Sequence, residues 1–252
     1  MFAEIMQNGL YAVKFNPGAT SIPILGVILL VIGAYLLGSL NSAVIVSRLL
    51  FREDIRTKGS GNAGLTNMFR IYGKKAALLT LFGDILKAVL AVLLAALFFG
   101  FSYRSALSFS PACYMAGLAC IIGHIKPIFY GFRGGKGVLS SATVILILCP
   151  PVFLALIVIF VLIVWVTRYI SLGSIVSSAA LPLLLQGYMQ AFIFTGDPEN
   201  YFEGGIVLYG FAFALIVIIC HRANIKRLWH HEENKFSFHR SSPKTEDPGD
   251  GK

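Results

Sequence analysis

The sequence has few charged residues and no polar block long enough to form a soluble domain. Only 13% of the 252 residues are charged, whereas 56% are hydrophobic, and the mean hydropathy is +0.76. A water-soluble fold of this size cannot bury so much apolar surface, so the composition excludes an ordinary soluble enzyme. The long apolar runs that remain predict a polytopic α-helical membrane protein.

Cysteine is also scarce, and its spacing excludes the common metal-binding patterns. The four cysteines, Cys113, Cys120, Cys149 and Cys220, lie in or beside apolar runs and include no C-x-x-C pair. We expect small buried apolar side chains here, not disulfides or metal ligands. We also expect no cleavable signal peptide, because the first apolar run is too long for a signal core.

Seven apolar runs predict seven transmembrane helices. They cover residues 22–50, 74–100, 112–126, 138–149, 152–166, 172–190 and 206–220. Pro150 and Pro151 separate the fourth run from the fifth, because proline interrupts a helix. The small and polar residues 38–42 of the first run are interpreted as helix-packing positions. Residues 1–236 then form one membrane domain, and residues 237–252 a disordered tail.

The basic residues predict how the chain is oriented. With seven spans the termini lie on opposite sides, and one side carries eighteen of the 21 Lys and Arg residues. This side faces the cytoplasm by the positive-inside rule, which places the C-terminus inside and the N-terminus outside. The net charge of +9 therefore indicates loops at a bacterial inner membrane and not a nucleic-acid partner.

A small-residue loop, residues 58–70, lies between the first two runs. It reads Lys-Gly-Ser-Gly-Asn-Ala-Gly-Leu-Thr-Asn-Met-Phe-Arg. Its glycines match G-x-G-x-x-G, but a charged segment precedes it and not a buried strand, which excludes a dinucleotide site. Its backbone amides suit a phosphate group. Residue types alone leave a simple connecting turn equally open.

A second glycine-rich basic loop spans residues 129–137 and reads Phe-Tyr-Gly-Phe-Arg-Gly-Gly-Lys-Gly. It is not a Walker A loop, because Tyr130 stands at the first glycine position and Gly137 replaces the Ser or Thr. Four glycines around Arg133 and Lys136 predict a second anion site. The alternative is a flexible basic turn that obeys the positive-inside rule.

Two charges and one histidine stand at unusual positions. Asp84 and Lys87 share a face of the second span deep in the bilayer, where charges are costly unless paired or facing a polar cavity. We expect them to brace or line a substrate cavity, and the alternative is an ion pair that only locks helices together. His221 and Asn224 follow the last span as candidates for proton transfer or ligand binding, or as interfacial caps.

These segments stand in an order that resembles one enzyme family. The matching motifs are the loop 59–70, Asp84-x-x-Lys87, Gly123-His124, Phe132-x-Gly-Gly-Lys-Gly-Val138, Arg168-Tyr-x-Ser-Leu-x-Ser174 and His221-Arg-x-Asn-Ile-x-Arg-Leu228 with Glu233-Asn-Lys235. They look like the bacterial acyl-phosphate-dependent glycerol-3-phosphate acyltransferases of the membrane-integral, PlsY type. The resemblance covers about residues 38–235. It implies an inner-membrane enzyme of phospholipid synthesis with its active site facing the cytoplasm.

The resemblance implies an activity and its partners. A fatty acyl group would move from acyl phosphate to the sn-1 hydroxyl of glycerol 3-phosphate, giving lysophosphatidic acid and inorganic phosphate. No cofactor or metal is implied. Membrane lipids surround the enzyme, and a soluble enzyme that produces acyl phosphate is an expected functional link.

The resemblance also implies roles for the matched residues. The acyl-phosphate phosphate would contact Ser60, Gly61, Gly134, Gly135, Lys136 and Gly137. Glycerol 3-phosphate would contact Arg70, Lys136, His221 and Asn224, with Ser171 or Ser174 nearby. Thr66 and Asn67 would shape the first loop, and Glu233 would orient neighbouring basic groups. The proton acceptor is open between His221, with an unperturbed pKa of about 6.5, and the substrate phosphate, which titrates near ~6; substrate assistance is favoured.

Four positions depart from the usual family pattern. Asn41 replaces a proline, Ala88 a glycine, Lys126 an aromatic residue and His231 a glycine. The last change lies two residues before Glu233, in the segment beside the expected active site.

Two other functions remain as alternatives. A transporter of phosphorylated metabolites would also use basic pockets, although the chain shows no internal repeat. A lipid phosphatase or phosphotransferase would need a metal cluster or a nucleophile constellation, and neither is evident.

Overall fold

A computed structural model describes residues 24–99, 111–192 and 205–236. All regular structure in these ranges is helical, and they contain no strand. The predicted all-α class is therefore confirmed for them. The predicted tail, residues 237–252, lies outside the described residues.

Every predicted span is helical, in whole or in large part. The helices are α2 (Ile24–Ser39), α3 (Ser42–Phe51), α4 (Leu65–Tyr72), α5 (Lys74–Phe99), α6 (Pro111–Ile125), α7 (Val138–Leu148), α8 (Pro150–Thr167), α9 (Ile170–Phe192), α10 (Gly205–Cys220) and α11 (Arg222–Trp229), with 3-10 turns η1 (Ile55–Thr57) and η2 (Ile128–Tyr130). Five stretches in the described ranges are long and apolar enough to cross a membrane, and α10 with α11 makes a sixth if this bent pair counts as one.

The first span is broken, which the sequence did not predict. Helix α2 ends at Ser39, and α3 starts after Asn41, whose side-chain Oδ1 accepts from the Val44 amide at 3.1 Å. An added Cβ at Gly38 would overlap the Cys120 carbonyl on α6. The interpretation of residues 38–42 as packing positions therefore fits Gly38. Asn41 instead caps a new helix at the place where relatives were expected to have proline.

Helix α7 by itself is shorter than the hydrocarbon core of a bilayer. It has 11 residues, whereas α8 has 18, and Pro150 starts α8 at the predicted division. At ~1.5 Å per residue, α7 spans roughly half of a ~30 Å hydrocarbon core. Gly137, just before α7, lies against the side chains of Ile121 and Ile125 on α6. The second glycine-rich loop therefore runs back along the last turns of α6 before α7 begins.

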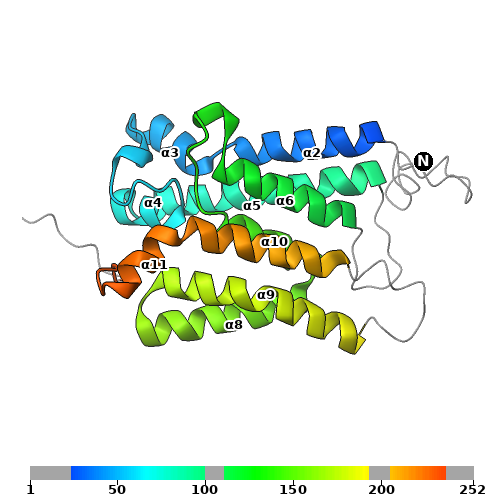
Figure 1. Cartoon of the computed structure of the whole chain (residues 1–252). Helices are drawn as coiled ribbons and strands as arrows, with labels where there is room; N and C mark the ends of the chain where they lie inside the picture. Colours follow the sequence, from blue (N-terminus) through cyan, green and yellow to red (C-terminus); the bar gives the residue numbers. More distant parts are fainter. Residues whose placement is uncertain (1–23, 100–110, 193–204, 237–252) are drawn as a thin grey trace, which may run out of the picture.

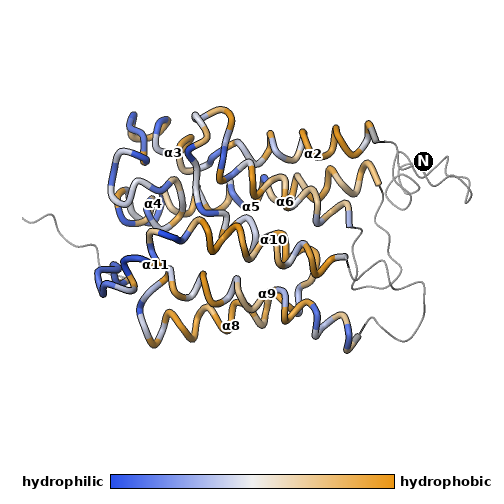
Figure 2. The backbone as a smooth tube through the Cα atoms, in the orientation of Figure 1, coloured by the Kyte–Doolittle hydropathy of each residue, from blue (hydrophilic) through white to orange (hydrophobic). Residues whose placement is uncertain are grey.

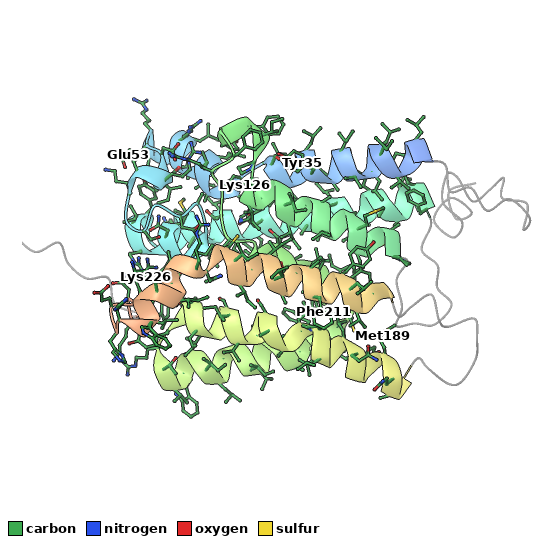
Figure 3. All side chains as sticks on the ribbon, viewed as in Figure 1. Tyr35, Glu53, Lys126, Met189, Phe211 and Lys226 are labelled. Carbon is green, nitrogen blue, oxygen red and sulfur yellow. The ribbon has the colours of Figure 1, made fainter. Side chains whose placement is uncertain are left out.

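The helices lie side by side (Figure 1), and one end of the bundle is polar (Figure 2). Figure 2 shows hydrophilic residues concentrated where α3, α4 and α11 lie, and we call this the polar end. Helix α2 begins at the opposite end (Figure 1). Apolar side chains project outward along the bundle (Figure 3), among them Phe211 of α10, which is 55% exposed. Such surfaces are expected to face lipid.

Candidate active site

A cavity of about 760 Å³ lies at the polar end and extends between helices toward the middle of the bundle. Thirteen of the sixteen predicted site residues line it: Ser60, Gly61, Thr66, Asn67, Arg70, Asp84, Lys136, Gly137, Ser171, Ser174, His221, Asn224 and Glu233. Gly134, Gly135 and Lys87 are absent from the lining. The fold thus brings residues from five motifs that are separate in the sequence to one site.

The deeper part of the cavity is apolar. Helix α7 contributes Leu139 and Ile145, α8 contributes Leu156 and Phe160, and α9 contributes Leu181. The cavity therefore joins a polar head to an apolar extension.

Asn67 holds the first glycine-rich loop in shape. Its side-chain Oδ1 accepts from the Ser60 amide at 3.1 Å, and its Nδ2 donates to the carbonyls of Lys58 at 3.0 Å and Asn62 at 3.1 Å. Gly59 and Gly61 have φ of 57° and 70°, a conformation that favours glycine. The loop is thereby fixed at the cavity rim.

Arg70 lies on α4, which begins at Leu65 and includes the last residues of the predicted loop 58–70. Its side chain is exposed and lines the cavity. Within the described ranges no carboxylate forms an ion pair with it, so its charge is available to an anion in the cavity.

In the second loop, Gly137 lines the cavity, whereas Gly134 and Gly135 do not. The amides of Gly134 and Gly135 donate to the carbonyls of Ile125 and His124, both at 3.1 Å. An added Cβ at Gly135 would overlap the ring of His124. Gly134 and Gly135 therefore join the loop to α6, and Lys136 and Gly137 are the residues that reach the cavity.

A hydrogen-bond network around Glu233 connects three motifs. Glu233 Oε1 accepts from Asn224 Nδ2 at 2.6 Å and from Ser171 Oγ at 2.8 Å. Its Oε2 accepts from Arg227 Nε at 2.7 Å. Asn224 in turn accepts from the Lys136 ammonium. Glu233 is thus the common partner of the basic and polar groups on this side of the cavity.

Burial and hydrogen bonds set the charges in this network. Burial is the main reason that the pKa of Lys136 is lowered to about 8, so its ammonium is charged at neutral pH. Burial raises the pKa of Glu233, but hydrogen bonds from Asn224, Ser171 and Arg227 outweigh it and lower the pKa. One cation and one anion therefore face each other across Asn224.

His221 lies in the bend after α10 with one ring nitrogen committed. Its Nδ1 is 2.8 Å from the Val217 carbonyl, which can only accept, so Nδ1 carries the proton. Burial and then the Lys136 charge lower the pKa of His221 to about 4. The neutral ring therefore leaves Nε2 as a proton acceptor or hydrogen-bond acceptor.

A buried cluster of charged and polar side chains forms one wall of the cavity. Lys87 Nζ lies 2.8 Å from Asp84 Oδ1, 2.7 Å from His124 Nδ1 and 3.2 Å from the Leu40 carbonyl at the break after α2. Asp84 and His124 line the cavity, and Lys87 lies behind them. Asp84 and Lys87 pair within α5, and Lys87 in turn joins α5 to His124 of α6 and to the break after α2. Asp84 forms part of the cavity wall, so the geometry is compatible with both interpretations of the pair.

Two residues of the site were not singled out from the sequence. His124 and Arg227 line the cavity, and both stand in the quoted motifs, yet neither received a role. The spacing of Asn224 and Arg227, three residues apart on one helix face, was the available signal for Arg227. His124 had no such signal, because its partners lie on another helix. In the described residues no group of His, Cys, Asp and Glu is arranged to hold a metal ion.

The family model described as glycerol-3-phosphate acyltransferase matches residues 28–231. A relative of this name from Syntrophomonas wolfei is 42% identical over 208 residues, covering 82% of this chain and 96% of the relative.

Two crystal structures of PlsY (YgiH), an integral membrane glycerol 3-phosphate acyltransferase, are also similar. The glycerol 3-phosphate form is 33% identical with a TM-score of 0.68, and it covers 84% of this chain and 96% of that one. The lysophosphatidic acid form is 31% identical with a TM-score of 0.66, and it covers 84% and 95%.

Proposed function

The chain belongs to the glycerol-3-phosphate acyltransferase family, and we propose that it transfers a fatty acyl group from acyl phosphate to the sn-1 hydroxyl of glycerol 3-phosphate. The products are lysophosphatidic acid and inorganic phosphate. The observation that carries this proposal is a single cavity whose cationic head continues into an apolar extension. Such a cavity suits a phosphorylated substrate beside a lipidic one.

In this proposal the head of the cavity binds two phosphate groups. One would lie against Ser60 and Gly61 beside Gly137, where the first loop and the start of α7 meet the cavity. The other would lie between Arg70 and Lys136, beside His221 and Asn224. Hydrogen bonds to an ionised phosphate are about twice as strong as hydrogen bonds between neutral groups.

The apolar extension suits the acyl chain. Its walls come from α7, α8 and α9, and they include Ile145, Phe160 and Leu181. Helix α7 is short and does not extend to the polar end. The phosphate groups and the fatty acyl chain can therefore occupy one continuous space. The carbonyl of acyl phosphate then lies where the polar and apolar parts meet.

The reaction requires positioning more than activation, because acyl phosphate is already a mixed anhydride. The hydroxyl oxygen of glycerol 3-phosphate attacks the carbonyl carbon, and the bond from that carbon to the phosphate oxygen breaks. Inorganic phosphate leaves with the electron pair, and the hydroxyl proton passes to a phosphate oxygen. Positioning of this kind is worth ~7–11 kcal/mol.

The proton acceptor in this proposal is the phosphate of glycerol 3-phosphate. A phosphate monoester with a pKa near ~6 is a stronger base than a group that titrates two units lower. Burial and the Lys136 charge lower the pKa of His221 to about 4, so His221 serves better as a hydrogen-bond partner that holds this phosphate.

We also propose seven membrane crossings in one domain, residues 1–236, with the polar end in the cytoplasm. The described chain begins in α2 at the apolar end and finishes after α11 at the polar end (Figure 1). This arrangement supports termini on opposite sides. The basic residues of the polar end support the cytoplasmic side of a bacterial inner membrane. Acyl phosphate is reactive, which supports its supply by a soluble enzyme acting at the same face.

The test is acyl transfer by the purified protein with palmitoyl phosphate and radiolabelled glycerol 3-phosphate. Wild type should form lysophosphatidic acid, and Arg70→Ala and His221→Ala should lose most of this activity. Arg52→Ala is the control, because Arg52 is exposed and does not line the cavity. A folded wild-type protein that forms no product contradicts the proposal. Uptake of glycerol 3-phosphate into proteoliposomes would then favour a transporter.

A further inference from the structure

Helix α11 has two chemically different faces. Asn224 and Arg227 face the cavity and hold Glu233. Arg222, Ile225, Lys226 and Trp229 fall within a sector of about 100° on the other side of a helix with 3.6 residues per turn. We call these four residues the outer face of α11.

The outer face is exposed and combines apolar and basic groups. Trp229 is 83% exposed and Ile225 is 41% exposed. Arg222 and Lys226 are exposed as well, and no ion pair within the described ranges involves either. Figure 3 shows Lys226 at the polar extremity of the bundle. Nothing in the described chain covers this face.

The position of α11 matches the headgroup layer of a membrane. It follows α10 directly and is bent from it by 59°, so it leaves the direction of the membrane-crossing helix. The polar layer of a bilayer adds roughly 5–7 Å on each side of the hydrocarbon core. Tryptophan concentrates in this layer, and lysine and arginine there are attracted to anionic lipids.

Further basic groups lie close to the end of α11. The Phe236 amide donates to the Arg168 carbonyl at 2.7 Å, which returns the chain to the turn between α8 and α9. Lys235 Nζ lies 5.9 Å from the centre of the Tyr169 ring. Glu232 is the exposed acid in this region. Cations therefore exceed anions around the outer face.

We propose that the outer face of α11 binds the headgroups of anionic phospholipids at the polar end, and that this contact stabilises the hydrogen-bond network of the active site. An eight-residue helix is not stable by itself. Its inner face supplies Asn224 and Arg227 to the network, so contacts on its outer face favour the ordered state of both. The lipid-binding half stands alone, and the effect on catalysis rests on the proposed acyltransferase function.

Tryptophan fluorescence tests the binding half. The chain has two tryptophans, Trp165 on α8 and Trp229 on α11. Trp165→Phe leaves Trp229 as the only tryptophan reporter, and Trp229→Phe is the matched control. In nanodiscs of phosphatidylcholine, headgroup-labelled quenching phosphatidylglycerol should quench Trp229 strongly. Adding Arg222→Gln and Lys226→Gln should weaken this quenching several-fold. Equal quenching with and without these two changes would overturn the proposal.

Activity measurements test the coupling. In phosphatidylcholine nanodiscs, Arg222→Gln with Lys226→Gln should match wild type within a factor of about two, since neither residue lines the cavity. Added phosphatidylglycerol should raise the wild-type rate several-fold and leave this double variant unchanged. Lys74→Gln with Lys75→Gln removes the same charge from the exposed start of α5 and should keep the response.

The outcomes separate this inference from the proposed function. Wild type that forms no lysophosphatidic acid in any lipid contradicts the acyltransferase function, whereas the quenching result still decides the lipid site. If wild type is active and phosphatidylglycerol changes the rates of wild type and of the α11 double variant equally, the proposed effect on catalysis is contradicted. The lipid-binding half of the proposal is unaffected by that result. If both double variants lose the response to phosphatidylglycerol, the effect comes from surface charge in general. That result would also overturn the proposed coupling between α11 and the active site.

Discussion

Lys136 is the residue whose surroundings most directly set the pH range of the proposed reaction. It is half-buried, and its hydrogen-bond partner Asn224 is neutral. Burial lowers the pKa of this lysine to about 8 from its usual value of 10.5. The protonated form binds phosphate, and it predominates below this pKa.

We therefore expect kcat/KM for glycerol 3-phosphate to fall as the pH rises through about 8, because Lys136 loses its proton there. Lys136→Arg should move this alkaline limb upward, since arginine stays protonated in proteins. The measurement is kcat/KM across neutral and alkaline pH for both proteins. An alkaline limb at the same pH in Lys136→Arg would assign it to another group.

His231 shows what one departure from the family pattern means physically. It has φ of 57° just after α11, where helices commonly end on a glycine. The left-handed conformation is costly for a side chain with Cβ, which accounts for glycine being usual there. The change leaves Glu233 in place, because its oxygens still accept from Asn224, Ser171 and Arg227.

His231→Gly should raise the stability of the protein by up to about 1 kcal/mol without loss of activity. The adjacent His230 has φ of −88° and provides the control. His230→Gly should lower stability by about 0.5–1 kcal/mol, because glycine gains no conformational benefit there. Thermal unfolding in detergent measures both. Equal effects of the two substitutions would show that φ at His231 is unimportant.

At the scale of elements, the second glycine-rich loop works through its contact with α6. Gly134 and Gly135 are hydrogen-bonded to the end of α6, and this contact brings Lys136 into the cavity. Gly135→Ala should displace the loop, since the new Cβ would overlap His124 and approach the Ala63 carbonyl.

We expect Gly135→Ala to lower kcat/KM by about 100-fold, as a misplacement of about 1 Å does in other enzymes. Gly187→Ala on α9 is the matched control, because nothing lies within 4 Å of its added Cβ. It should retain wild-type activity. A Gly135→Ala protein that is fully active would mean that the loop tolerates a shift away from α6.

The buried cluster of Asp84, Lys87 and His124 joins α5, α6 and the break after α2. Removing one partner leaves an unpaired charge in a low-dielectric interior. Lys87→Met should therefore destabilise the fold by about 3–5 kcal/mol. Lys74→Met, at the exposed start of the same helix, should change stability little.

A double-mutant cycle distinguishes an ion pair from independent packing at this cluster. Lys87→Met combined with Asp84→Leu should cost less than the sum of the two single changes, because neither charge is then left alone. Thermal unfolding of the four proteins in one detergent gives the comparison. Additive effects would indicate that the two side chains contribute separately.

At the scale of the whole molecule, the two ends of the bundle differ in polarity (Figure 2). The cavity, both glycine-rich loops and α11 all belong to the polar end. The described chain ends after α11 at this polar end (Figure 1), so the proposed topology puts the C-terminus on the side of the cavity. A reporter fused there should accordingly show whether the active site faces the cytoplasm.

We expect green fluorescent protein at the C-terminus to fluoresce and alkaline phosphatase at the same place to be inactive, because each folds on one side of the inner membrane only. The test is both fusions in a bacterial host at matched expression. The reverse pattern would place the cavity outside, away from any soluble supplier of acyl phosphate.

Much of the fold is encoded locally and was predicted from the sequence. Hydropathy and proline positions depend on residues close together in the chain, so they gave the helical class, the apolar segments and the division at Pro150. The break at Asn41 was missed, because its Nδ2 bonds to the Ala63 carbonyl of a separate loop. The place in the bundle at which α7 begins was also not predicted, because it depends on the contact of Gly137 with α6.

The sequence alone determined the class of protein, the motifs and the family that they resemble. Composition and the spacing of residues within a motif can be read from the sequence without knowing the tertiary structure. Only the tertiary structure decided which motif residues meet. It joined Lys136 to Asn224, 88 residues away, made Glu233 the centre of a network, and put Gly134 and Gly135 against α6. The contacts of Lys136 with Asn224 and of Ser171 with Glu233, which lie 62 residues apart, depend on how whole helices pack, and no local pattern specifies them.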